Sequence, residues 1–155
     1  PRRRNKAMMN WIKKQGVAGL LLAVAAICAI VAVIIYGVNS TTGVMQNVEL
    51  DAAPIIYSVI AVVLVVAMIA VTGKVPQWVI SAAMVAVVVL LTLSIGDFIY
   101  NRTDVAGNQW FIPDLDTPEQ GACLSQAIVG VVFYALSVVA VVVAAFIGKF
   151  NKETA

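Results

Sequence analysis

The sequence predicts an all-α integral membrane protein with four transmembrane helices. Three observations carry that prediction. The composition is too apolar for a soluble domain, four long runs contain no charged residue, and the basic residues gather in segments that would share one side of a membrane. We expect residues 1–155 to form a single four-helix membrane domain. The four helices could pack as two tandem helical hairpins.

The composition excludes several classes of protein. Hydrophobic residues make up 62% of the chain and charged residues 12%, against about 45–50% and about 25% in soluble domains. Too few polar side chains are present to cover a surface in water, so the surplus apolar residues are expected to face lipid. A disulfide scaffold, a nucleic-acid-binding module and an ordinary cytosolic enzyme are excluded. The lipid bilayer is the first partner that we expect.

The four apolar runs are long enough to cross a membrane. They cover residues 17–38, 54–72, 75–96 and 124–147. About 20 helical residues, at about 1.5 Å each, cross the ~30 Å hydrocarbon core. Backbone groups at that depth find no water, so helix is the expected conformation. The segments 39–53 and 97–123 then become the two outer loops.

The distribution of Lys and Arg predicts the orientation. Nine of the ten basic residues fall on one side if the helices alternate, and seven of the eight acidic residues fall on the other. The positive-inside rule then places both termini in the cytoplasm. The Val- and Ala-rich helices and short loops favour the cell (plasma) membrane of a bacterium. An anchor on the inner leaflet is predicted for Arg2, Arg3, Arg4, Trp11, Lys13 and Lys14.

The two halves of the chain share a pattern at their helix ends. A tyrosine lies at the outer end of the first span (Tyr36) and just after the third span (Tyr100). Gly-Lys pairs at 73–74 and 148–149 follow the second and fourth spans. An internal duplication would explain the pattern. The rules of topology would also produce it, because each hairpin needs an aromatic residue at the outer interface and a lysine at the inner one.

The second outer loop is the more elaborate and is the predicted docking surface for a partner. Its candidate residues are two aromatics and three acids: Trp110, Phe111, Asp114, Asp116 and Glu119. A purely structural alternative is that the aromatics rest on lipid headgroups, while Thr117 caps a helix that begins at Pro118. The rest of a calcium-binding loop is absent, so we predict no metal and no cofactor.

The predicted spans contain no ionisable group that would mark a proton pathway. Asp97, at the outer end of the third span, is the nearest charged residue, which argues against a proton-coupled antiporter. The fourth span carries a stripe of small and polar residues: Gln126, Gly130, Tyr134 and Ser137. Such a stripe either packs helices together or lines a polar path.

These observations favour a protein that is not an enzyme. The sequence has no His, and nothing beside its carboxylates supplies a nucleophile, a metal set or an oxyanion site. We expect an accessory or scaffolding subunit of a larger membrane complex, such as a transporter, whose partners are other integral membrane subunits or further copies of itself. The alternative is a self-assembling small transporter or channel with the polar face of the fourth span along its path.

Overall fold

The computed structural model describes residues 2–148, and of residues 11, 12, 14 and 15 it describes the backbone alone. Every regular element in this part of the chain is helical, and four helices are long and apolar enough to cross a membrane. The prediction of an all-α chain with four candidate spans is therefore confirmed. The elements are α1 (Arg2–Thr41), η1 (Gly43–Met45), α2 (Ala53–Val71), α3 (Gln77–Tyr100), α4 (Thr103–Phe111), η2 (Pro113–Leu115) and α5 (Pro118–Ile147).

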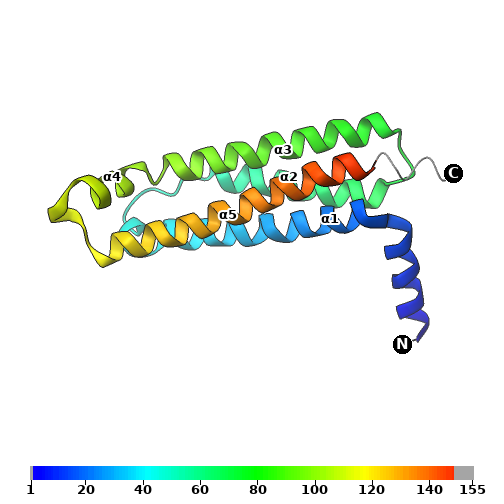
Figure 1. Ribbon diagram of the computed structural model, residues 1–155, viewed down its shortest axis with the longest axis horizontal. Coiled ribbons are helices and arrows are strands. Elements are labelled where there is room, and N and C mark those ends of the chain that lie inside the picture. Colours follow the sequence, from blue (N-terminus) through cyan, green and yellow to red (C-terminus); the bar gives the residue numbers. More distant parts are fainter. Residues whose placement is uncertain (1, 149–155) are drawn as a thin grey trace.

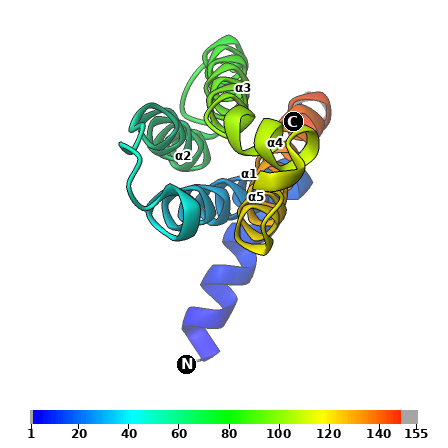
Figure 2. The same ribbon diagram turned by 90° about the vertical axis from the view of Figure 1, so that its left-hand side faces the viewer.

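The four long helices form an up-and-down bundle (Figure 1). Seen along the bundle, α1 lies between α2 and α5, and α3 closes the ring on the opposite side (Figure 2). The most extensive contacts join α1 with α5 and α2 with α3. The two tandem hairpins, α1–α2 and α3–α5, are consequently not separate packing units, because each helix contacts a helix of the other hairpin more than its own partner.

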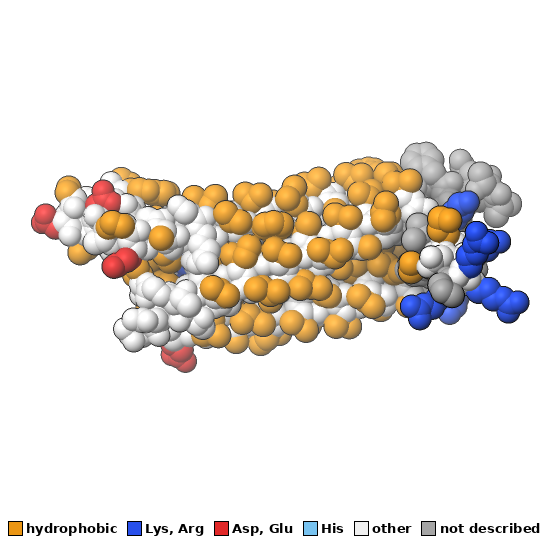
Figure 3. Space-filling model, turned by 90° about the horizontal axis from the view of Figure 1, so that it is seen from below, with side chains coloured by type: hydrophobic (Ala, Val, Ile, Leu, Met, Phe, Trp, Pro, Cys, Tyr) orange, Lys and Arg blue, Asp and Glu red, His pale blue; other side chains and the backbone are white. Residues whose placement is uncertain are grey.

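Small residues on one face of α1 allow this close packing. Ala25, Ala29 and Ala32 are fully buried and recur at helical spacing. Small residues let the backbones of neighbouring membrane helices approach closely. The opposite faces of the helices carry exposed Val, Ile and Leu side chains, which form an apolar belt around the bundle (Figure 3). Such a belt is what a lipid-facing surface requires.

Two of the helices extend further toward the acidic end than hydropathy alone predicted. α3 continues to Tyr100, and α5 begins at Pro118 rather than near residue 124. The segment 97–123 is therefore mostly helical, with α4 and η2 inside it, and the connection between the third and fourth spans is shorter than hydropathy predicted. Thr117 accepts a hydrogen bond from the Gln120 backbone N–H, so its predicted role as a helix cap is confirmed. Hydropathy misses such turns because their polar side chains face water.

α1 bends sharply at Gly16, so that its first residues lie across the bundle axis (Figure 1). Gly16 has φ 67° and ψ −170°, a backbone conformation essentially restricted to glycine. The bend suits a segment that lies along a membrane surface. Arg2, Arg3, Arg4 and Lys13 are exposed on it, whereas the side chains of Trp11 and Lys14 lie outside the described residues.

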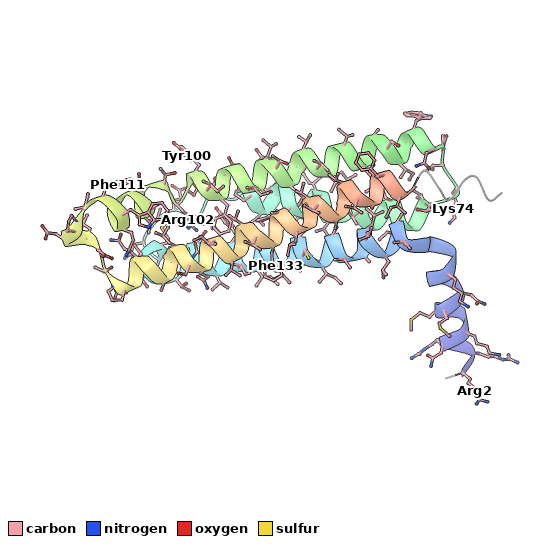
Figure 4. The ribbon with its side chains drawn as sticks, viewed as in Figure 1. Arg2, Lys74, Tyr100, Arg102, Phe111 and Phe133 are labelled. Atoms are coloured by element: carbon pink, nitrogen blue, oxygen red, sulfur yellow. The ribbon has the colours of Figure 1, made fainter. Side chains whose placement is uncertain are left out.

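The two ends of the bundle carry opposite charge (Figure 3). Lys74 and the bent segment from Arg2 lie at one end (Figure 4), which we call the basic end. Ala18 and Gly148 lie close together there, since a Cβ atom on Gly148 would be 4.0 Å from that of Ala18. The opposite end, with η1, α4 and η2, is the acidic end. Lys149 and Lys152 lie outside the described residues.

The likeness between the two halves does not extend to the tyrosines. Tyr36 is buried beside Phe98, whereas Tyr100 is 78% exposed. The two side chains therefore have different roles, one in the core and one at the surface. The shared sequence pattern carries no argument for duplication at these positions.

Gly130→Ala is expected to lower the free energy of unfolding by about 1–3 kcal/mol, as overpacking of a filled core does. A Cβ atom at Gly130 would lie 2.6 Å from Phe98 Cε1 and 3.0 Å from Ile35 Cγ2. Gly96 is the matched control, because nothing lies within 4 Å of a Cβ atom placed there. The apparent Tm in detergent should fall for Gly130→Ala alone, and an unchanged Tm would contradict this packing.

Candidate functional site

Arg102 lies in the break between α3 and α4 and is buried, with 4% of its surface exposed. It is the single basic residue of the acidic end among the residues that the structure describes. Figure 4 shows its position at the junction of these two helices. A buried arginine requires acceptors for its N–H groups, since an unpaired charge in a low-dielectric interior is strongly unfavourable.

Neutral groups supply those acceptors. Arg102 Nε donates to Asn39 Oδ1 at 2.6 Å, and Nη2 donates to Ser40 Oγ at 2.5 Å. Nη1 donates to the backbone oxygen of Asn101 at 3.0 Å. The planar guanidinium thereby ties the end of α3 to the end of α1, in a fork geometry that lysine does not have.

Two aromatic rings complete the surroundings of the guanidinium. Its central carbon lies 5.7 Å from the ring centre of Tyr36 and 5.3 Å from that of Phe98. The two rings meet edge to face, with centres 4.8 Å apart and an interplanar angle of 87°. Contacts between a cation and ring faces at such distances are attractive, and more so when water is excluded.

No carboxylate in the described part of the chain forms an ion pair with Arg102. Burial lowers the pKa of Arg102 from its usual value, but a guanidinium still keeps its proton in proteins. The acidic end therefore contains a buried positive charge that dipoles and rings stabilise. We call Asn39, Ser40, Asn101 and Arg102 the arginine cluster.

Asn39 extends the arginine cluster to α5. Its Nδ2 donates to the backbone oxygen of Cys123 at 2.9 Å and to Gln126 Oε1 at 3.0 Å. The Asn39 side chain thus accepts from Arg102 and donates twice to α5, so it connects the break between α3 and α4 to α5. Cys123 is buried and free.

Asp51 connects the first loop of the acidic end to the same region. Its Oδ2 accepts a hydrogen bond from Asn101 Nδ2 at 2.9 Å, and its Oδ1 accepts one from the Ala53 backbone N–H at 2.9 Å. Its backbone oxygen accepts the Tyr36 hydroxyl at 2.8 Å. The hydrogen bond from Asn101, followed by that from Ala53, lowers the pKa of the Asp51 carboxyl below its usual value.

The predicted polar stripe of α5 lies mainly in the interior of the bundle. Tyr134 forms a 2.8 Å hydrogen bond with Ser58, which also lies 3.1 Å from Ser94 Oγ. Ser137 donates to the backbone oxygen of Ala25 at 2.7 Å. Gly130 packs on the ring of Phe98. Gln126 is exposed at the acidic end, so it does not share the buried environment of Gly130, Tyr134 and Ser137.

Apolar side chains fill the bundle interior between Ser137 and the basic end. The buried residues of this half include Leu22, Met68, Ile80, Met84, Ala140, Val141 and Ala144. They share one core cluster, and in the described residues no hydrophilic side chain is buried among them at this depth. The polar contacts above therefore end against a hydrophobic layer.

Of the predicted docking residues, Trp110 alone lines a hollow together with a member of the arginine cluster, Arg102. Trp110 and Phe111 at the end of α4 are exposed, as are Asp114, Asp116 and Glu119. Gln109 Nε2 donates to Asp116 Oδ1 and holds η2 against α4. Phe111 points away from the bundle (Figure 4). The acids are spread along η2 and the start of α5. No group of three His, Cys, Asp or Glu suited to a metal occurs within residues 2–148.

Two hollows flank α4. An apolar groove of about 440 Å³ separates α3 and α4 from α5, and Phe98, Ile99, Trp110, Ala127, Ile128 and Val132 are among its lining residues. A second cleft, of about 430 Å³, lies between η1 and α4 and has a more polar rim. In the end-on view, α4 lies over the seam between α3 and α5 (Figure 2).

Sequence analysis did not single out Arg102, Asn39 or Asp51 as members of one site. One signal was present, because Arg102 is alone among acids on its side of the predicted membrane. A lone cation among acids on one side of a membrane protein is a candidate for burial beside hydrogen-bond acceptors. Comparisons with protein-family models, with curated proteins and with solved structures find no match to this chain.

Arg102→Lys is expected to lower the free energy of unfolding by about 1.5–3 kcal/mol, the range for hydrogen bonds to charged groups. A lysine ammonium cannot reach Asn39, Ser40 and the Asn101 carbonyl at once. The apparent Tm in detergent measures the effect. The exposed Arg3 supplies the control, since Arg3→Lys should leave the Tm unchanged. Equal stability of Arg102→Lys and the wild type would show that the fork geometry is unimportant.

Acid is expected to weaken the attachment of the first loop. Because the pKa of Asp51 is lowered in the fold, its contribution to stability is fully present above the ordinary pKa of about 3.9 and is lost as the pH falls through the lowered pKa. Between pH 6 and pH 3, the apparent Tm of the wild type should therefore fall more than that of Asp51→Asn. Glu119→Gln, at an exposed acid, should follow the wild type. Parallel curves for all three proteins would refute the assignment.

Proposed function

We propose that this chain is a non-enzymatic accessory or scaffolding subunit of a larger membrane complex, such as a transporter. The observation that supports this proposal best is the apolar groove between α3, α4 and α5. The proposal includes the orientation inferred from the sequence, in the cell membrane of a bacterium with both termini in the cytoplasm and the acidic end outside.

The groove lies where a helix of another membrane subunit would pack. It runs along α5 from Leu124 to Val132, which is about 12 Å of helix. Leu124 is level with the arginine cluster, and Val132 lies deeper, in the apolar belt. Association in lipid depends on close van der Waals packing, and a groove offers a partner helix more contact than the convex faces elsewhere.

The surface beside the groove suits contact with the same partner outside the membrane. Trp110 lines the groove, and Phe111 next to it is exposed. Aromatic side chains are enriched at the centres of protein interfaces, and charged side chains at their rims. Asp114, Asp116 and Glu119 would then form the rim of the docking surface.

The alternative, a self-assembling small transporter or channel, receives less support from the geometry. A path along Tyr134 and Ser137 would end against the apolar layer around Val141 and Met68. Transport would therefore need a path between copies of the chain. Ion or solute flux in liposomes that contain this protein alone would favour that alternative over the proposed role.

Ile128→Trp is expected to reduce recovery of a stoichiometric companion at least tenfold when the protein is purified from native membranes in mild detergent. The indole would fill the groove in which the partner packs. Ile128 is 58% exposed and lines the groove, whereas Val63 of α2 is 60% exposed and does not. Val63→Trp is therefore the matched control and should keep the companion.

Two outcomes would contradict the proposal. One is a wild-type protein that purifies without any stoichiometric companion. The other is equal recovery of the companion with Ile128→Trp and Val63→Trp, which would place the contact elsewhere on the chain. The apparent Tm of both variants, measured alongside, separates a lost interface from a misfolded bundle.

A further inference from the structure

The cleft between η1 and α4 has the lining of a binding site for a small ligand. Its volume of about 430 Å³ falls within the range of about 300–1,000 Å³ that is typical of ligand pockets. It lies beyond the ends of α1 and α3, and so outside the apolar belt. None of the functions proposed above uses it.

The lining combines an apolar floor with a few polar groups. Met45 and Val105 are buried and pack together in a small cluster of their own, and Val48 adds a third apolar side chain. Asn101 and Asn108 bring amides to the rim. Ligand sites are mostly apolar with a small number of polar groups that set specificity, and this cleft has that composition.

The charge of the cleft is negative. Asp104 is the charged residue of its lining, is exposed, and forms no ion pair within the described residues. The guanidinium of Arg102, the nearest cation in sequence, is directed away toward Asn39 and Ser40. Asp51, bonded to the other side of Asn101, adds a second negative charge nearby. A ligand that complements this field carries positive charge.

An aromatic ring stands at the same cleft. Tyr100 lines it and is 78% exposed, so one ring face is available to a ligand. Ammonium groups bind over aromatic faces through the ring quadrupole. A carboxylate, an open aromatic ring and an apolar floor together match a cation that carries a short apolar chain.

We propose that the cleft between η1 and α4 binds an amphiphilic organic cation. Its ammonium group lies between Asp104 and Tyr100, and its apolar part lies on Met45, Val48 and Val105. This binding uses a different hollow from the docking role, because the groove beside α5 lies on the other flank of α4.

The test uses the full chain in nanodiscs of zwitterionic lipid, with hexyltrimethylammonium as the probe and isothermal titration calorimetry as the readout. Hexanol and hexanoate are the neutral and anionic analogues, and empty nanodiscs give the background partition. Saturable binding of the cation, at least tenfold tighter than that of either analogue, is expected for the wild type.

Variants locate the site. Asp104→Asn should weaken binding about fivefold, the size of an exposed charge pair, and Tyr100→Leu about two- to fivefold, the size of an exposed cation–π contact. Asp114→Asn is the matched control, because Asp114 is an exposed acid on η2 that does not line the cleft, and it should leave affinity unchanged. Val48→Trp, which fills the floor, should abolish binding without changing the charge.

Three results would overturn the proposal: binding of hexanol as tight as that of the cation, equal losses for Asp104→Asn and Asp114→Asn, or full binding by Val48→Trp. The first result would mean that the probe binds only by hydrophobic partition. The second would mean that the cation is attracted only by the overall negative charge of the acidic end. The third would place the ligand outside the cleft. Co-purification of a membrane companion bears on none of these outcomes, so the two proposals fail separately.

Discussion

The acidic end of the bundle depends on one buried charge. The guanidinium of Arg102 is held by the side chains of Asn39 and Ser40, by the Asn101 carbonyl and by two aromatic rings. Taking a charge out of water is unfavourable unless every donor finds a partner, so these groups must keep their positions together. Asn39 carries the constraint onward to α5. The ends of three helices are thereby fixed in register.

Hydropathy and charge were sufficient to predict the four spans, because lipid leaves an apolar chain few choices other than helix. They did not predict α4, since polar helices outside a membrane give no apolar run, and the start of α5 at Pro118 was indicated only by the capping pattern of Thr117. Hydropathy and charge did not predict the arginine cluster for another reason. Asn39 and Arg102 are hydrophilic and would ordinarily face water, so their burial follows only from the packing of α1 against α3 and α5.

Helix α4 differs from the rest of the molecule in how it is held. It rests on α5 through a small cluster that includes Val105 and Leu124, with a hollow on either flank. A short helix with few buried apolar contacts opens locally at a low free energy compared with the core. The two proposed binding surfaces both include side chains of α4, so an occupant of either hollow would restrict the same element.

The largest helix contact joins the first and last spans, and this has a consequence for biosynthesis. While the ribosome is still making α5, the alanine face of α1 and the amide of Asn39 have no counterpart from that helix. Contacts between distant parts of a chain form late, because the intervening loop must first be closed. The nascent protein would thus reside in the bilayer as an incomplete three-helix species. The bundle is completed only when α5 inserts. Until then, a chaperone or a neighbouring subunit has access to the face of α1 that α5 later covers.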